Sequence, residues 1–227
     1  MSSPGEEVQT VDRLQTTVGL AFGRTLSWYS RLAVHPEKFL VEGNPCPAEA
    51  GVIWTAWHGS NLILLEAYRR LNPDRTLFLL IPPGLSGAVQ RGRMAGTRME
   101  SLALPADGTG NPIAALKAMV RGLAAGNDVA IAPDGPAGPN HRVRPGTLWL
   151  ARHTGRPIWL VGCAARPCLH WPRWDRHVIP LPGAHVAMVV DEPLYVDRRD
   201  DLEALEKSLA ERLDAAERRA WELITNE

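Results

Sequence analysis

The chain has 227 residues, of which 45% are hydrophobic, and its 25 lysines and arginines balance 25 aspartates and glutamates. A chain of this size can bury one sizeable core, so we expect a single domain, and its zero net charge provides no overall field that would attract nucleic acid. Three cysteines without metal-type spacing predict a reducing compartment and no disulfide framework. The polar start MSSPGEEVQT is unlike a signal peptide and no apolar run is long enough to span a bilayer, which predicts a cytoplasmic protein that is soluble or peripheral.

The N-terminal segment divides into residues 1–7, expected to be disordered, and residues 8–34, expected to form an amphipathic helix. Apolar residues recur on one face at helical spacing: Val11, Leu14, Val18, Phe22, Tyr29 and Leu32. Arginines gather on the opposite face: Arg13, Arg24 and Arg31. This pattern suits a helix that lies on an anionic membrane surface, and it equally suits a helix packed on the domain with a solvated outer face.

The remaining residues, 35–227, alternate expected strands with expected helices. Strands are expected at 38–41, 52–57, 76–81, 99–104, 128–132, 157–164 and 186–190. Helices are expected at 60–71, 86–95, 112–125, 146–154 and 201–224. The alternation predicts one α/β domain, with a mixed, mostly buried β-sheet flanked by helices.

Two strand ends carry the groups with the clearest catalytic potential. The apolar run VIWTAW delivers His58 to the start of a helix, and VAIAPDGPAGP runs from a buried strand into a loop with Asp134 at its mouth. Gly135 and Gly138 let backbone amides approach a ligand, and the intervening prolines hold the shape of the loop. Together the two strand ends predict a catalytic rim, although either motif alone favours a structural turn.

Other polar groups are open to two readings. Arg142 and Arg144 flank the loop and suit a phosphate of a lipid or of coenzyme A, or else a solvated basic loop, and Arg91 and Arg93 are weaker candidates for the same role. The remaining histidines show no metal-type spacing, so no metal site is expected. No serine lies in a G-x-S-x-G elbow, which makes a hydrolase a distant alternative. The tryptophans of HWPRWD suit packing under a loop or a position at a lipid headgroup boundary.

The order of motifs resembles that of a known family. WHGSNLILL, GNDVAIAPDGPAGP, VRPGTLWLARHTGRPIWLVGCAA and WDRHVIPLPGAHVAMVVDEPLYV follow one another along the chain. In this combination they resemble the lysophospholipid acyltransferase-like proteins, a bacterial branch of the glycerolipid acyltransferase superfamily. The resemblance runs from about Gly51 to Val196. It implies that the expected domain, residues 35–227, has an acyltransferase-like α/β fold.

The resemblance implies transfer of a fatty acyl group from acyl-CoA or acyl carrier protein to a hydroxyl of a lysophospholipid or related membrane lipid. His58 matches the family histidine, the general base, and Asp134 is expected to act with it as a catalytic residue. The expected substrate-binding residues are Ser60, Gly135, Pro136, Gly138, Arg142 and Arg144. The thioester is a substrate, so no tightly bound cofactor is expected. Expected partners are the lipid acceptor, acyl carrier protein and the inner face of the cytoplasmic membrane, and no nucleic acid.

One departure from the family bears on activity. The superfamily places an aspartate five residues after the histidine, where it holds the imidazole in one tautomer, but this chain has Ile63 there. Glu66 lies two helical turns beyond His58, too far for a direct hydrogen bond. Either a carboxylate from elsewhere, Asp134 or Asp107, orients the ring, or the protein is a non-catalytic lipid-binding homologue. We expect His58 and Asp134 to face one groove, with a carboxylate oxygen in reach of the ring.

Overall fold

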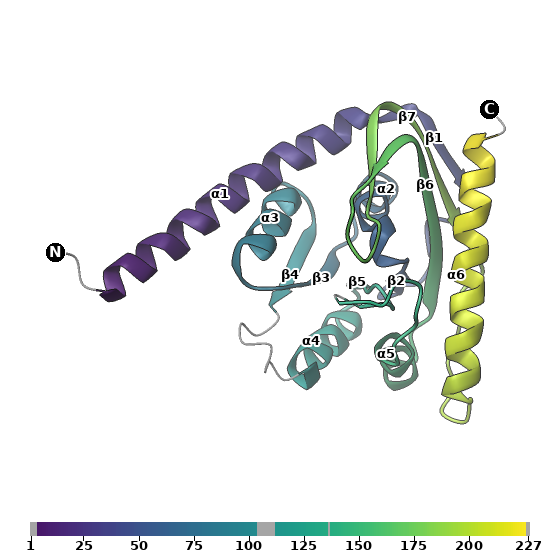
Figure 1. Cartoon of the computed structure of the whole chain (residues 1–227). Helices are drawn as coiled ribbons and strands as arrows, with labels where there is room; N and C mark the ends of the chain where they lie inside the picture. Colours follow the sequence, from purple (N-terminus) through teal and green to yellow (C-terminus); the bar gives the residue numbers. More distant parts are fainter. Residues whose placement is uncertain (1–3, 104–111, 136, 226–227) are drawn as a thin grey trace.

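The structure, a computed structural model, describes residues 4–103, 112–135 and 137–225 and places its strands in one sheet flanked by helices (Figure 1). The strands are β1 (Val34–Glu42), β2 (Ile53–Thr55), β3 (Leu77–Ile81), β4 (Met99–Ala103), β5 (Asp128–Ala130), β6 (Ile158–His170) and β7 (Val178–Val190). The helices are α1 (Pro4–Ala33), the 3-10 turn η1 (His58–Ser60), α2 (Asn61–Leu71), α3 (Gly84–Met94), α4 (Pro112–Ala124), α5 (Gly146–Thr154) and α6 (Leu202–Thr225).

The sheet is mixed, with strand order β1-β7-β6-β2-β5-β3-β4. Strands β6 and β7 pair antiparallel, and every other described neighbouring pair is parallel. The predicted fold class, a single α/β domain with a mixed sheet flanked by helices, is confirmed. Because β2 and β5 are parallel neighbours, the loops that follow them emerge at the same edge of the sheet.

Different helices bury the two faces of the sheet. Residues alternate between faces along a strand, so Trp54 of β2 packs with α2 on one face, and its neighbour Ile53 packs with α4 and α5 on the other. Helix α6 extends this second layer along β6 and β7, where Ala216 and Ala220 contact buried strand residues (Figure 1). Strand β2, which leads to His58, is thereby held by packing on both faces of the sheet.

A buried carboxylate joins the layers at the amino end of β5. Asp128 is fully buried and accepts hydrogen bonds from the Val52 amide (3.0 Å), the Trp54 indole (3.1 Å) and the Tyr68 hydroxyl (2.9 Å). The Arg75 guanidinium donates two more, at 2.8 and 2.6 Å. Burial and the charge of Asp128 raise the pKa of Tyr68, so its hydroxyl remains a donor.

Several element boundaries differ from the sequence expectation, most of all those of α1, β6 and β7. Helix α1 begins at Pro4, so residues 4–7, expected to be disordered, are helical, while residues 1–3 lie outside the described part. Strands β6 and β7 extend to His170 and from Val178, well beyond the expected 157–164 and 186–190. The outer part of β6, from Arg166 to His170, is mostly exposed and mixes polar with apolar residues, so it lacks the apolar run by which a buried strand is recognised.

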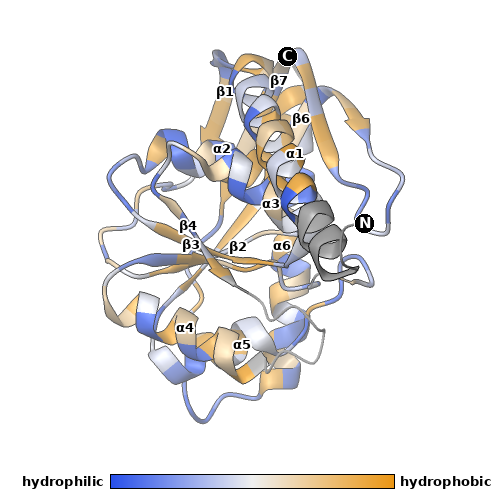
Figure 2. Cartoon of the chain, turned by 90° about the vertical axis from the view of Figure 1, so that its left-hand side faces the viewer, coloured by the Kyte–Doolittle hydropathy of each residue, from blue (hydrophilic) through white to orange (hydrophobic). Residues whose placement is uncertain are grey.

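Helix α1 packs on α3 through small residues (Figure 1). A Cβ atom at Gly23 would lie 2.0 Å from the Val89 carbonyl oxygen, and one at Gly92 would lie 2.3 Å from that of Leu20, so the two backbones are in direct contact. The large apolar residues of the expected stripe are therefore left outside: Leu14, Val18 and Phe22 are 63%, 54% and 55% exposed. Figure 2 shows hydrophobic positions along α1 where it extends from the body.

The described helices include none that is long and apolar enough to cross a membrane.

Candidate active site

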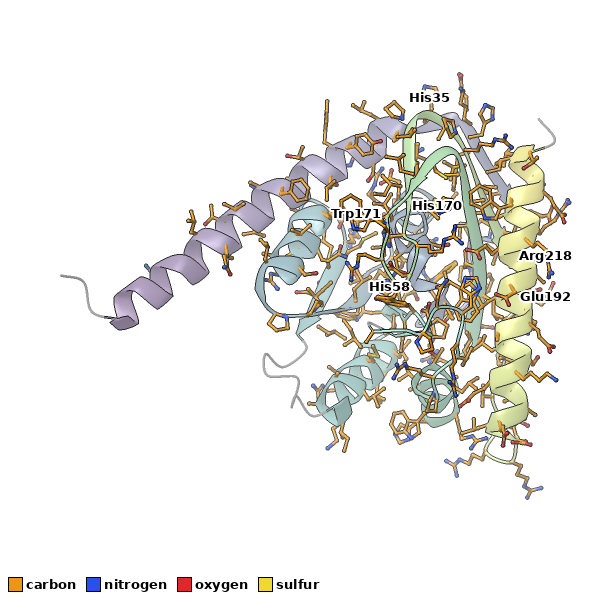
Figure 3. The ribbon with its side chains drawn as sticks, in the orientation of Figure 1. His35, His58, His170, Trp171, Glu192 and Arg218 are labelled. Carbon is orange, nitrogen blue, oxygen red and sulfur yellow. The ribbon has the colours of Figure 1, made fainter. Side chains whose placement is uncertain are left out.

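His58 lies at the junction of β2 and α2, near the centre of the molecule (Figure 3). The chain leaves β2 at Thr55 and enters η1 at His58, where the Ser60 amide donates to the Trp57 carbonyl at 2.9 Å. Trp57 is buried, which anchors the turn, while the His58 side chain stays 26% exposed. One edge of the imidazole therefore reaches solvent while its backbone is fixed by the core.

The imidazole is held by a carboxylate from the turn between β6 and β7. The Nδ1 atom of His58 lies 2.7 Å from Oδ2 of Asp175, a side chain that is only 1% exposed. Burial alone raises the pKa of Asp175, but the hydrogen bond from His58 and the charges of His177 and Arg173 outweigh it and lower the pKa. An ionised Asp175 fixes the proton on Nδ1, so Nε2 presents its lone pair. Among the described residues no hydrogen bond reaches Nε2.

Two glycines allow the turn to approach this closely. A Cβ atom at Gly59 would lie 2.3 Å from the Asp175 carbonyl oxygen, so any side chain at position 59 would push the turn away from His58. A Cβ atom at Gly138, whose φ is +71°, would lie 2.7 Å from the Trp174 ring. The Trp174 ring in turn lies 5.1 Å from the His58 ring, centroid to centroid. The turn is therefore held between η1 and the loop that contains Gly138.

Asp134 does not hold the ring of His58, which corrects the sequence expectation. Its fully buried carboxylate accepts the main-chain amide of His58, at 3.1 and 3.4 Å from its two oxygens. Burial raises the pKa of Asp134, opposed by hydrogen bonds from the amides of His58, Asp134 and His141. Asp134 thus fixes the backbone that carries the imidazole, while Asp175 fixes the imidazole itself. Asp107, the other expected carboxylate, lies outside the described residues.

The loop around Gly135 is closed by its own hydrogen bonds. Gly135 has a φ of +67° and donates its amide to the Ala132 carbonyl at 3.1 Å, so that amide is not free for an oxyanion. The Arg144 amide donates to Pro133 at 2.8 Å, and its guanidinium donates to the Gly138 carbonyl. These bonds give Arg144 a structural role, whatever it binds besides.

Arg142 and Pro136 are the two remaining residues that were expected to bind the substrate. Arg142 is exposed and accessible to a ligand. Pro136 lies outside the described residues.

Ser60 belongs to a polar network with α6. Its buried hydroxyl donates to Glu217 at 3.0 Å, so its proton is already committed. His141 joins the same network, with Nδ1 2.8 Å from Asp214 and Nε2 3.5 Å from Glu217. The His141 ring stacks on Trp57 with centroids 4.7 Å apart, and its backbone has a φ of +56°, unusual for a residue other than glycine. Through Ser60 on one side of His58 in the chain and Trp57 on the other, the network links α6 to the segment that carries His58.

His177 also lies against Asp175, with Nδ1 3.6 Å from Oδ2. Burial lowers the pKa of His177 to about 4, although Asp175 opposes the shift. With His58 these groups offer three possible metal-ligand atoms within 4.8 Å of one another. However, ligands around a tetrahedral zinc lie about 3.3 Å apart, given metal–ligand distances near 2.0 Å, whereas Nδ1 of His58 and Oδ2 of Asp175 are at hydrogen-bond distance. The geometry favours a histidine–carboxylate pair.

Sequence reasoning missed Asp175, although a signal was present. Asp175 is part of WDRHVIPLPG, one of the segments on which the family resemblance rests, and it lies in the turn between two strands of the sheet. The longer range of β6 and β7 is what turns that segment back toward His58.

Comparisons with known proteins agree with this architecture. The crystal structure of the 1-acyl-sn-glycerophosphate (LPA) acyltransferase PlsC from Thermotoga maritima superimposes with a TM-score of 0.54, over 92% of this chain and 79% of that chain, at 20% sequence identity. The fold is similar to an acyltransferase fold. An uncharacterized protein of Rickettsia prowazekii (strain Madrid E), RP090, is 28% identical over 200 residues, 83% of this chain and 89% of the relative. No family model matches the chain.

Proposed function

We propose that the protein is an acyltransferase that moves a fatty acyl group from an acyl thioester, on coenzyme A or acyl carrier protein, to a hydroxyl of a lysophospholipid or related membrane lipid. The observation that carries the proposal is the 2.7 Å contact between Nδ1 of His58 and Oδ2 of Asp175. An ionised carboxylate on one ring nitrogen and a solvent-facing second nitrogen are what a general base for a hydroxyl requires. The similarity of the fold to that of PlsC supports the reaction class.

The proposed reaction uses His58 twice. Its Nε2 takes the proton of the acceptor hydroxyl as that oxygen attacks the thioester carbonyl carbon. The imidazolium formed is stabilised by Asp175, which does not itself need to become protonated. When the tetrahedral intermediate collapses, the carbon–sulfur bond breaks and His58 returns the proton to the leaving thiolate. The products are the acylated lipid and the free thiol, and the enzyme is restored.

Two rival functions are less well supported by the site. A non-catalytic lipid-binding homologue would have no need of a carboxylate on the His58 ring, yet Asp175 is there, buried and hydrogen-bonded. A serine hydrolase requires a serine hydroxyl at the imidazole. Ser60, next but one to His58, donates to Glu217 instead, and no serine in the described part of the chain hydrogen-bonds to His58.

The membrane role is part of the same proposal. The exposed Leu14, Val18 and Phe22 of α1 are available to enter the headgroup region of a bilayer. The exposed Arg13 and Arg24 suit an anionic lipid surface, such as the inner face of the cytoplasmic membrane. A lipid acceptor would then be taken from the surface on which α1 rests.

The experiment that tests the function is thioester consumption by the purified protein with a panel of lysophospholipids. His58→Ala should lower turnover roughly a hundredfold or more, the usual scale for loss of a general base. Asp175→Asn should lower kcat by a comparable factor with little change in KM, because the ring loses its tautomer control but substrate contacts remain.

Asp74→Asn, which removes an exposed carboxylate, is the matched control and should behave as the unmodified protein. Full activity of His58→Ala would remove the imidazole from the mechanism, and full activity of Asp175→Asn would leave the proposal without its main support.

A further inference from the structure

The loop that follows β5 contains a residue with an unusual backbone conformation. His141 has a φ of +56°, in the left-handed region that residues other than glycine rarely adopt. Such a conformation persists only where surrounding contacts compensate for its cost, and it often marks a functional position. The contacts of the His141 side chain show what compensates for the cost here.

The His141 ring faces two carboxylates of α6. Its Nδ1 atom lies 2.8 Å from Oδ1 of Asp214, and its Nε2 atom lies 3.5 Å from Oε2 of Glu217. An imidazolium, which donates from both nitrogens, satisfies both carboxylates at once. Among the described residues, every ion pair of Asp214 and Glu217 is with His141. His141 therefore supplies the positive charge that these two acids share.

Glu217 depends on that charge because it is poorly solvated. Burial raises its pKa, whereas the charge of His141 and the hydrogen bond from Ser60 lower it. The helix that carries Glu217 is fixed at close range to the sheet, since a Cβ atom at Gly162 of β6 would lie 2.1 Å from the carbonyl carbon of Ala216. Helix α6 is therefore a firm support for the two carboxylates.

The ring of His141 also packs directly on the residue before His58. An ion pair as exposed as that of His141 and Asp214, at 36% and 45%, contributes little by itself. Here, however, the ring stacks on the buried Trp57 with centroids 4.7 Å apart, and Asp214 accepts the Trp57 indole at 2.9 Å. The three side chains thus form one unit, in which each contact restricts the other two.

Asp134 connects the main chain of His141 to that of His58. Its buried carboxylate accepts the amides of both residues. The loop cannot shift at His141 without straining the hydrogen bond to His58, because one carboxylate holds both amides. A displaced His58 backbone would move the imidazole relative to Asp175, which is carried by the separate turn between β6 and β7.

We infer that the imidazole of His141 is a positioning group, which anchors the loop after β5 to α6 and thereby fixes the backbone of His58. This inference rests on the proposed function for its kinetic consequence, although not for the geometry of the His58 ring. The proposed reaction moves no proton through His141, so loss of its ring should lower kcat and leave KM nearly unchanged.

The first test is kinetic. His141→Asn removes the ring and keeps a residue type that tolerates a left-handed backbone. In the thioester assay it should lower kcat about tenfold, because misplacement of a catalytic group by about 1 Å can cost a hundredfold. His153→Asn is the matched control, since His153 also stacks on a tryptophan, Trp149, with centroids 4.8 Å apart, but on the exposed surface of α5. Equal kcat in the two variants would overturn the inference.

The second test asks whether His141 acts through α6. Asp214→Asn keeps an oxygen that can accept the Trp57 indole and removes the charge that faces His141. It should lower kcat alone, but have little further effect in the His141→Asn background, since effects that share one contact do not add. Full additivity of the two substitutions would overturn the link to α6.

The third test needs no substrate. The proton between Nδ1 of His58 and Asp175 should give a low-field proton NMR signal, identified by its absence in His58→Ala. We expect His141→Asn to shift or broaden this signal and His153→Asn to leave it in place, with thermal unfolding to show that both variants are folded. An unchanged signal in folded His141→Asn would overturn the inference. If no acceptor supports turnover in the unmodified protein, the proposed function fails, whereas this signal still decides whether His141 positions the ring.

Discussion

The imidazole of His58 is oriented by a side chain 117 residues further along the chain, not by one on the following helix. Position 63, where the superfamily carries its aspartate, holds Ile63, which is buried in the core between α2 and the sheet. Asp175, from the turn between β6 and β7, accepts the hydrogen bond of Nδ1 instead. The chemistry requires an acceptor at Nδ1, and that acceptor can come from any part of the chain that the fold brings to the ring.

His177 gives the site a pH dependence that can be measured as stability. Burial holds its pKa near 4 in the folded state, against about 6.5 for an unperturbed histidine. Between these values the unfolded chain binds a proton that the folded chain does not, so stability is present above pH 6.5 and is lost as pH falls toward 4. From pH 7 to pH 5 we expect a loss of about 2 kcal/mol from this group.

Urea unfolding of the unmodified protein and of His177→Gln at the two pH values measures this loss. The glutamine variant should lose about 2 kcal/mol less between them, and His35→Gln, at an exposed histidine, should match the unmodified protein. An unchanged pH dependence in His177→Gln would show that folding does not lower the pKa of His177.

At the scale of residues, the sequence located His58 and Asp134 but not the contact that joins them, which runs through the main chain of His58 and not through its ring. Both follow buried strands, and the parallel pairing of β2 with β5 is what brings them together at one edge. The direction of a side chain within a loop depends on tertiary contacts that the pattern does not contain. Asp134 therefore accepts a hydrogen bond from the main-chain amide of His58, and Ser60 donates one to Glu217. The contact between Asp175 and His58 could be found only once the turn between β6 and β7 had been placed.

Among the elements, the turn between β6 and β7 is the one on which the site depends. Its approach to η1 leaves no room at Gly59, where a Cβ atom would lie 2.3 Å from the Asp175 carbonyl oxygen. Gly59→Ala should therefore displace the turn and lower kcat at least tenfold, since misplacement of a catalytic group by about 1 Å can cost a hundredfold.

Gly146→Ala is the matched control, because a Cβ atom there meets nothing within 4 Å. Its kcat should be unchanged in the same assay. Activity of Gly59→Ala equal to that of this control would mean that the contact between η1 and the turn is not needed to position Asp175.

Helix α1 presents its apolar residues outward because its small residues face α3, and this predicts membrane binding. Replacement of Leu14, Val18 and Phe22 together by serine should weaken binding to anionic vesicles at least tenfold, because each buried CH₂ group contributes about 0.8 kcal/mol. Binding should also weaken with added salt, because arginines on α1 are exposed.

Vesicle sedimentation measures both effects, and Gln15→Ser with Thr25→Ser, at exposed polar positions of α1, is the control. Sedimentation of the triple variant at the level of this control would place the membrane contact elsewhere on the molecule.

At the scale of elements, the sequence predicted every described α-helix and strand of the sheet, but not the 3-10 turn η1 nor the full lengths of β6 and β7. Buried strands and capped helices can be recognised in the sequence from the spacing of apolar residues and from the residues that begin and end helices. Beyond Ala165, β6 leaves the core, and its residues do not alternate between buried and exposed positions. Only the pairing with β7 identifies this part as a strand. The amphipathic pattern of α1 could not show which face meets the protein, because Gly19 and Gly23 enter no apolar count and yet make that contact.

In the whole molecule, the buried ion pair of Asp128 and the candidate catalytic residues lie at opposite ends of the parallel strands. Asp128 begins β5 and collects its partners at the amino end of the sheet, whereas Asp134 and His58 follow β5 and β2 at the carboxyl end. A change at the first end is therefore expected to alter the free energy of unfolding without altering the geometry at the second.

Asp128→Asn tests this separation. The asparagine would leave the Arg75 guanidinium, the Tyr68 hydroxyl and the Trp54 indole to share one neutral carbonyl oxygen. Breaking a buried ion pair by removal of one partner costs about 3–5 kcal/mol, because the remaining charge is uncompensated. We therefore expect the variant to unfold at a markedly lower urea concentration, while kcat measured under conditions where it is folded stays at the level of the unmodified protein. Asp74→Asn, at an exposed aspartate, should change stability by no more than about 0.5 kcal/mol. A fall in kcat for folded Asp128→Asn would show that the two ends of the sheet are coupled, since Asp128 contacts Trp54 of β2 only four residues before His58.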